Sequence, residues 1–500
     1  MTSLLFKKRS LLTTALCLSL TGGVGSVNAE NNEVSILNTL PNYTTDTSDF
    51  PISTLTLPLF RVEGERTVQG TIGLDWDTGQ FEVFDVKRVP MATKTEKDDG
   101  FDPVIAEQLD QYLDKVINEY GKPGAVIRVD MGEHSWRGVA GISRFQECCG
   151  DKPRIFSEKF RIGSITKMIV ASAVMALVQD GKLDLDDTME ELFSGESWYS
   201  KMPNGDKITV RDVLRHQTGL ADHIPQASFL CHPFTRISPI DLLIPAFEKS
   251  QDPNSIFHKD GNQTPRSEFE IGTDYEYSNT NYVIAGLLIE KATGKSVVDG
   301  INRYVLIPLK AFNTAFPVEV AIPYVYASGY MKMAGSLNEK GECIINPNTA
   351  DFQDTTFIEP SLPWTAGGMI SNVNDLVKIV KGQATGTSPE LSSQLLEQRF
   401  DFVSAGHGAS YGLGIYDIEG YLGHLGQIVG FDNAVFYHPE KDIAIAINMN
   451  AYPLGQIDAS KVFDEVREIL DEKTPRSSAK QSEGQGFILN PACSDQPVCY

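Results

Sequence analysis

The sequence predicts an α+β fold in which an antiparallel sheet is flanked by N- and C-terminal helices. Apolar residues recur at helical spacing over residues 103–120, and two alternating runs at 124–132 and 135–143 look like the strands of a hairpin. Further alternating runs lie within residues 411–448 and are followed by a helical pattern at 459–470. Strands bracketed by helices are typical of domains in which the helices pack on one sheet.

The chain is long enough to bury a sizeable core, since it has 500 residues of which 41% are hydrophobic and 22% are charged. We expect one large domain at residues 101–472 with an all-helical insert at about 183–273, and a flexible tail at 473–500. Residues 30–100 are predicted to form a small β-rich extension, because alternating runs occur there at 53–60, 67–74 and 80–86. The polar stretch 91–100 is predicted to be a linker.

The N-terminus predicts a secretory signal peptide at residues 1–29. Basic residues at 7–9 precede an apolar stretch at 11–20, and small residues end at Ala29, after which cleavage is expected. The apolar part is too short to span a membrane, and the residues before Cys17 match a lipid-modification site poorly. We therefore expect a periplasmic or secreted protein without a stable membrane anchor, an uncleaved anchor being the alternative.

The charge excludes nucleic acid as a partner. The formal net charge is −23, and removal of the leader, which holds three basic and no acidic residues, takes it to −26. Such a chain repels nucleic acid and anionic membrane surfaces. The expected partner is a small-molecule or peptide substrate.

Six cysteines follow the predicted leader, an even number in a compartment where disulfides form. Cys493 and Cys499 are the preferred pair, and the other four allow three pairings. Their spacing does not resemble a zinc site, so no metal site is predicted. The four are Cys148, Cys149, Cys231 and Cys343.

The segment RIGSITKMIV at residues 161–170 contains a candidate nucleophile. The helix that begins near Ser164 is apolar on almost every face, which is typical of a buried helix. Lys167 lies on the same face as Ser164, and desolvation lowers the pKa of a buried lysine towards the range where its neutral form can accept a proton. The alternative is that Ser164 only caps the helix, but capping does not explain a lysine in the first turn.

Two later segments add candidate residues. Tyr277 and Asn279 immediately precede another apolar helix, and His424 and Gly426 lie at the end of a strand-like run. Taken separately, they are equally compatible with core packing, a helix cap and a buried polar group. A phenol can relay protons, and an amide can bind an acyl side chain or orient a lysine.

Together, in this order, the motifs resemble the serine β-lactamase and penicillin-binding superfamily, especially its branch of class C β-lactamases, DD-carboxypeptidases and related esterases. The resemblance covers residues 103–470 and includes the stretches GKPGAVIRV at 121–129, HQTGL at 216–220 and AGGMISNVNDLVKIV at 366–380. It implies a β-lactamase-like fold and hydrolysis through an acyl-enzyme, without a cofactor.

The resemblance also implies a role for each matching residue. Ser164 would be the nucleophile, Lys167 its proton acceptor and Tyr277 the proton relay. Asn279, His424 and Gly426 would bind substrate, and the backbone amides of Ser164 and Gln427 would form the oxyanion hole.

The third motif departs from the family pattern of Lys-Thr/Ser-Gly. Leu425 has no hydroxyl, and His424 is expected to be cationic only in part at neutral pH. Recognition of a substrate carboxylate is therefore weakened, which argues against an efficient β-lactamase.

Export, the expected cell-envelope compartment and the histidine form of the third motif favour a D-alanyl-D-alanine carboxypeptidase-like peptidase acting on a cell-wall peptide. The alternatives are an esterase, a D-amino-acid peptidase or a β-lactamase of the same fold, and a non-catalytic binding module. Ser410 fits the Gly-x-Ser-x-Gly elbow of α/β-hydrolases, but its glycine-rich context continues as a strand rather than as a helix.

Overall fold

The computed structural model describes residues 93–471 apart from nine short segments, and before residue 93 it describes the backbone of five strands. Four short strands between residues 256 and 346 are also described by their backbone alone. The segments left out are 146–150, 225–233, 253–254, 260–261, 318–319, 323–324, 338–342, 347–350 and 453–456. The chain forms two compact units, residues 1–93 with 140–154 and residues 94–139 with 155–500.

The first unit contains an antiparallel three-stranded sheet of β3 (Thr54–Glu63), β4 (Arg66–Asp75) and β5 (Phe81–Val89). These strands coincide with the three alternating runs of the predicted extension. Two short strands, β1 (Val27–Asn28) and β2 (Glu33–Val34), pair with each other. The rest of the predicted leader, the predicted tail and the cysteine side chains after the leader lie outside the described residues.

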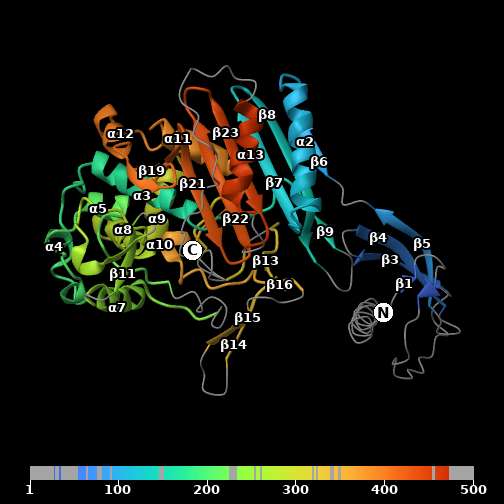
Figure 1. Cartoon of the computed structure of the whole chain (residues 1–500), viewed down its shortest axis with the longest axis horizontal. Coiled ribbons are helices and arrows are strands. Elements are labelled where there is room, and N and C mark those ends of the chain that lie inside the picture. Colours follow the sequence, from blue (N-terminus) through green and yellow to red (C-terminus); the bar gives the residue numbers. More distant parts are fainter. Residues whose placement is uncertain are drawn as a thin grey trace, which may run out of the picture. The chain divides into compact units, whose positions relative to one another are not determined.

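The second unit contains most of an antiparallel sheet with the strand order β18-β19-β20-β21-β22-β23-β7-β8-β6 (Figure 1). Strand β9 pairs with the end of β8 at residues 142–144, which the division places in the first unit. The first and last long strands of the domain, β7 and β23, are neighbours at its centre, with Ala125 opposite Met449. The strands are β6 (Lys94–Lys97), β7 (Gly124–Met131), β8 (His134–Arg144), β9 (Lys152–Pro153), β18 (Val403–Gly406), β19 (Ala409–Tyr411), β20 (Tyr416–Ile418), β21 (Tyr421–Ile428), β22 (Phe431–His438) and β23 (Ile443–Met449).

Strand β6 corrects the prediction of a linker at residues 91–100. It pairs with β8 from Lys94 opposite Val139 to Lys97 opposite Trp136. Glu96 forms ion pairs with Lys94 at 2.7 Å and with Arg137 at 2.5 Å. The stretch is polar because it forms the edge of the sheet, where charged side chains remain in water and discourage pairing with other chains.

Helices cover both faces of the sheet. On one face lie α2 (Pro103–Asn118) and α13 (Ala459–Asp471), which contact each other and the central strands (Figure 1). Phe436 of β22 packs on Phe463 of α13 with ring centroids 4.3 Å apart. On the other face α3 (Ile165–Gln179) and α11 (Val373–Ala384) contact β21 and β22. The predicted sheet with N- and C-terminal helices is confirmed.

In its described residues, the insert between α3 and α8 (Asn279–Thr293) contains helices and also the hairpin of β11 (Ile256–Lys259) and β12 (Asn262–Pro265). The prediction of an all-helical insert is wrong in this detail, although the Asp-Gly dipeptide at 260–261 is a hairpin signal. The remaining elements are α4 (Met189–Phe193), η1 (Tyr199–Lys201), α5 (Val210–Arg215), α7 (Pro239–Ser250), η2 (Arg266–Glu268), α9 (Val297–Ile301), η3 (Asn302–Leu306), α10 (Trp364–Gly367), α12 (Ser393–Arg399), β10 (Phe160–Arg161), β13 (Tyr330–Met331), β14 (Ala334–Leu337), β15 (Cys343–Asn346), β16 (Gln353–Asp354) and β17 (Ile370–Ser371).

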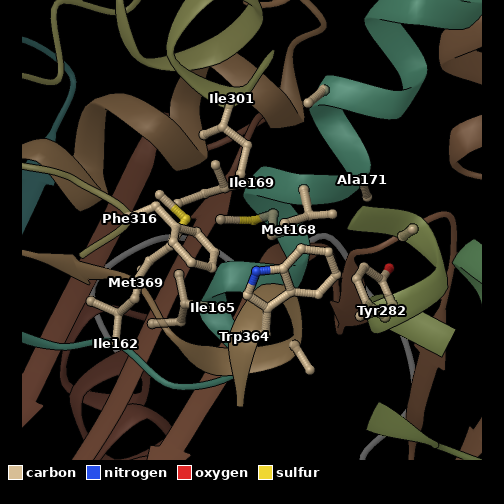
Figure 2. Packing of buried hydrophobic residues seen from close by; sticks show 14 of the residues in the cluster. Ile162, Ile165, Met168, Ile169, Ala171, Tyr282, Ile301, Phe316, Trp364 and Met369 are labelled. Carbon is tan, nitrogen blue, oxygen red and sulfur yellow. The ribbon is translucent and has the colours of Figure 1, made fainter. Parts of the chain in front are cut away.

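Helix α3 is buried on every side, as its sequence predicts. All its residues from Ile165 to Leu177 are buried. Figure 2 shows Met168 and Ile169 of α3 within a cluster that includes Trp364 and Phe316. Each such side chain stabilises the fold by roughly 1.5–3 kcal/mol relative to exposure, so the helix that begins at the candidate nucleophile is fixed by its packing. None of the helices among the described residues is both long and apolar enough to cross a membrane.

Candidate active site

Ser164 lies at the N-terminus of α3. If it were only a helix cap, its side chain would accept a hydrogen bond from a backbone N–H of the first turn. Its side chain makes no capping hydrogen bond, and its backbone is already helical, with φ −63° and ψ −9°. Its Oγ instead accepts a hydrogen bond of 2.9 Å from Nζ of Lys167. The capping interpretation is therefore wrong for this side chain, which is held towards the lysine.

Lys167 is completely buried, and its Nζ has three oxygen neighbours. Besides Ser164 Oγ, it donates to Oδ1 of Asn279 and to the backbone oxygen of Ala366, both at 2.7 Å. An ammonium group uses all three protons in these bonds. A neutral amine has two protons and a lone pair, so it can keep the bonds to Asn279 and Ala366 and accept the proton of Ser164.

Burial of Lys167 favours this neutral form more strongly than nearby groups favour the cation. Burial lowers the pKa of Lys167 from its ordinary 10.5 to about 7, while the negative charge of Asp222 acts in the opposite direction. The Tyr277 ring, whose centroid is 4.8 Å from Nζ, also favours the cation. A pKa near neutrality suits a general base, because both protonation states are then populated at the operating pH.

Tyr277 is placed beside the nucleophile by the segment that precedes α8. Its ring packs on His216 with centroids 4.3 Å apart and planes inclined by 33°. Burial raises the pKa of Tyr277 well above its ordinary value, although a hydrogen bond with Ser164 lowers it. The phenol therefore stays protonated and can pass a proton only while it receives another, as a relay does.

Asn279, the first residue of α8, is buried between the Lys167 amine and the Asp222 carboxylate. Its Oδ1 accepts from Lys167, and its Nδ2 donates to Oδ2 of Asp222 at 2.8 Å. The structure thus gives Asn279 the second of its two predicted roles, the orientation of the lysine. Contact with substrate stays a prediction.

Two glycines bring the backbone of β21 against the residues before Ser164. A Cβ on Gly163, which has φ +52°, would lie 2.9 Å from the Gln427 nitrogen, and a Cβ on Gly426 would lie 2.0 Å from the Ile162 oxygen. Strand β20 pairs with β21 only as far as Gly423, so this edge of β21 is not covered by β20. The close approach brings the backbone of Gly163, the residue before Ser164, against the backbone of Gln427. An oxyanion hole formed by the amides of Ser164 and Gln427 stays a prediction.

Asn433 of β22 forms hydrogen bonds to both segments of this backbone contact. Its Nδ2 donates to the backbone oxygens of Arg161 at 3.1 Å and Gly426 at 2.6 Å. Its Oδ1 accepts from Asn448 at 2.8 Å, and the side chain is completely buried. One amide thereby holds the strand before the nucleophile against the strand that supplies Gln427.

His424 is buried, and both of its ring nitrogens have partners. Nδ1 lies 2.5 Å from the backbone oxygen of Leu425. Because a carbonyl oxygen can only accept a hydrogen bond, Nδ1 carries the ring proton. Nε2 then accepts a hydrogen bond from the Tyr411 hydroxyl at 3.0 Å. Burial lowers the pKa of His424 to about 3. The predicted partial positive charge at neutral pH is therefore wrong, because the sequence did not reveal how deeply the ring is buried.

Sequence reasoning missed several residues of the site. His216 opens the stretch HQTGL at residues 216–220, which carries part of the resemblance but was assigned no role, and Asp222 lies just after this stretch. Ala366 acts through its backbone oxygen, which no motif can reveal. Ser410, the rival nucleophile, lies in the hairpin of β18 and β19 and is not followed by a helix, so the elbow geometry is absent there.

Comparison with known proteins gives a family match, because the Beta-lactamase family model matches residues 109–462. The chain is 24% identical to the Unguisins hydrolase ungD' of Aspergillus campestris, over 72% of this chain and 64% of the relative, and 28% identical to Esterase EstB of Burkholderia gladioli, over 44% and 55%. It covers less than two thirds of the length of these curated relatives.

Solved structures of similar fold include a D-stereospecific amidohydrolase and a D-amino acid amidase. The D-stereospecific amidohydrolase from Streptomyces sp. is 26% identical with a TM-score of 0.58, over 74% of this chain and 98% of that protein. The D-amino acid amidase from Ochrobactrum anthropi SV3 is 23% identical with a TM-score of 0.57, over 74% and 100%.

Proposed function

This chain belongs to the Beta-lactamase family. We propose that it is a serine hydrolase that cleaves D-aminoacyl amide and peptide bonds through an acyl-enzyme on Ser164. The observation that carries the proposal is the buried Lys167 amine, 2.9 Å from Ser164 Oγ and held by two further acceptors.

The proposed reaction uses these groups in order. The neutral amine of Lys167 takes the proton as Ser164 Oγ attacks the substrate carbonyl, and the amides of Ser164 and Gln427 stabilise the oxyanion. The C–N bond breaks when the leaving nitrogen receives a proton through the Tyr277 hydroxyl, which is replenished by Lys167. Water then attacks the ester and returns Ser164.

The substrate class follows from the third motif and from one relative. A terminal carboxylate needs a fixed positive charge, but burial keeps His424 neutral and Leu425 is apolar. Among the described residues, the cation in contact with Ser164 is Lys167, which the reaction itself uses. The likeness to a D-stereospecific amidohydrolase, whose full length the chain nearly covers, supports a D-aminoacyl group joined to an uncharged leaving group.

A D-alanyl-D-alanine carboxypeptidase-like activity is the second candidate. It is favoured by the predicted leader at residues 1–29, which would bring the enzyme into the periplasm or the medium, where cell-wall peptides occur. We place either activity in that compartment.

The test is a comparison of kcat/KM for four substrates, with Ser164→Ala as control. The substrates are a D-aminoacyl amide, its L enantiomer, and a D-alanyl-D-alanine peptide with a free or an amidated C-terminus. We expect preference for the D-amide and at least tenfold preference for the amidated peptide, all abolished in Ser164→Ala. Preference for the free carboxylate would establish the carboxypeptidase instead, and turnover of acyl esters alone would indicate an esterase.

Intact-mass analysis after incubation with a penicillin adds an independent test of the nucleophile. An adduct mapped to Ser164 supports the acyl-enzyme. Ring opening without an adduct would indicate a β-lactamase. If neither penicillin nor an acyl ester modifies Ser164, the chain is a binding module.

A further inference from the structure

Asp222 has a place in the site that neither the motifs nor the mechanism assigns. It follows the HQTGL stretch, and its carboxylate accepts three N–H groups. Oδ2 accepts from the backbone nitrogen of Asn279 at 3.1 Å and from Nδ2 of Asn279 at 2.8 Å, while Oδ1 accepts from Ile224 N at 2.8 Å. The carboxylate is therefore fixed on the far side of Asn279 from Lys167.

This contact decides which way the Asn279 amide points. A carboxylate only accepts hydrogen bonds, so the amide nitrogen must face Asp222 and the oxygen must face Lys167, 2.7 Å away. An amide turned by 180° would present its NH2 group to the amine. That arrangement would compete with Ser164 for the lone pair of the neutral lysine.

The same carboxylate is the negative charge that acts on Lys167. The aromatic rings of Tyr277 and Tyr282 lie 4.8 and 5.7 Å from Nζ. Three histidines also surround the amine, and burial lowers their pKa values, so they contribute no charge at neutral pH. These histidines are His216, His223 and His424. The charge of Asp222 also acts on the guanidinium of Arg266, as does that of Glu276.

We propose that Asp222 is a positioning residue of the Ser164 reaction, which orients the Asn279 amide towards Lys167 and keeps a negative charge behind it. This inference rests on the proposed hydrolase function. Its competitor is a purely structural role, because Asp222 also caps α8, where the Ser278 side chain makes no capping bond.

The experiment measures the rate of Ser164 acylation by p-nitrophenyl acetate between pH 5 and 9, by nitrophenol release and intact mass. Asp222→Asn keeps an acceptor oxygen but removes the charge, and Asp222→Glu keeps the charge. Asp222→Ala is a second uncharged variant in case the first does not fold. Asp212→Asn is the matched control, since Asp212 caps α5 through Thr209 but does not contact Asn279 in the hydrogen bonds of the structure.

We expect the acid limb of the profile to move to lower pH in Asp222→Asn by about one to two units, since a charge one amide group away has an effect of this size at an effective dielectric constant of about 20. The plateau rate should also fall, as the amide loses its preferred orientation. In Asp222→Glu and Asp212→Asn, the acid limb of the pH–rate profile should lie at the same pH as in the wild type.

An unmoved limb in both uncharged variants, with only a lower melting temperature, would leave Asp222 as a helix cap and overturn the inference. Failure of the proposed function has a different signature. In that case the wild-type protein itself would not be acylated at Ser164 at any pH.

Discussion

Replacing Gly426 with alanine should open the predicted oxyanion hole. The new Cβ would lie 2.0 Å from the Ile162 oxygen and 2.9 Å from Cγ1 of Ile165. Because Cβ atoms essentially never approach closer than 3.0 Å, β21 must move away from residues 162–165 by about 1 Å or more. That movement separates the amides of Ser164 and Gln427.

The expected size follows from what one oxyanion donor contributes. Its loss costs about 10²- to 10³-fold in rate, or roughly 3–4 kcal/mol, while overpacking lowers the free energy of unfolding by about 1–3 kcal/mol. Gly423 provides a matched control in the same strand, because a Cβ there would lie 2.0 Å from the Val435 oxygen. Gly423→Ala should be destabilised to a similar extent with a much smaller loss of rate.

The assay is the acylation rate of Ser164 by an activated ester, measured below the onset of urea unfolding for each variant. A folded Gly426→Ala variant that is acylated within about threefold of the wild-type rate would refute the assigned oxyanion hole. Equal rate losses in the two alanine variants would refute it as well, since the effect would then come from strain in β21.

Three further results are expected. The acylation rate should rise with pH through a single ionisation near 7, because protonated Lys167 cannot act as a base. The pKa of His424, at about 3, lies below the pH range of the assay. A second inflection between pH 5 and 8 in the pH–rate profile would contradict this expectation. The pKa of Lys167 in the folded protein is below its ordinary value, so above pH 7 the unfolded chain binds one more proton than the folded chain. The free energy of unfolding should therefore increase between pH 7 and 9 by about 2 kcal/mol more in the wild type than in Lys167→Met, which urea denaturation can measure. Asn433→Ala should lower the free energy of unfolding by about 2–4 kcal/mol, because two buried carbonyl oxygens lose their donor; equilibrium unfolding in urea checks this, with Ser404→Ala as an exposed control.

The parts of the fold that sequence predicted well are those with strong periodicity. Helix α3 is apolar on every face and is buried on every face, and the runs at 433–437 and 443–448, expected as strands, lie in β22 and β23. The errors lie where local pattern and context disagree. Lys94 to Lys97 are polar because they form a sheet edge, and the β11–β12 hairpin lies among helices.

In the site, the sequence identified residues whose type is uncommon at their position in a helix or strand. An example is Lys167, a charged residue in the first turn of an apolar helix. It did not identify partners that act through geometry. The Ala366 oxygen belongs to the backbone, Asp222 lies 57 residues from the Asn279 amide that it contacts, and His424 is hydrogen-bonded to Tyr411 of another strand. Such roles depend on tertiary contacts rather than on residue spacing.

The bonds of Lys167 join segments that are far apart in the chain, since Asn279 is 112 residues and Ala366 is 199 residues away. A folding intermediate that has formed α3 but has not yet docked α8 and α10 would contain Ser164 and Lys167 without a reactive hydroxyl. Covalent labelling of Ser164 would therefore report the completion of folding rather than the formation of any one element. During refolding, the appearance of the label would time the last of these docking events.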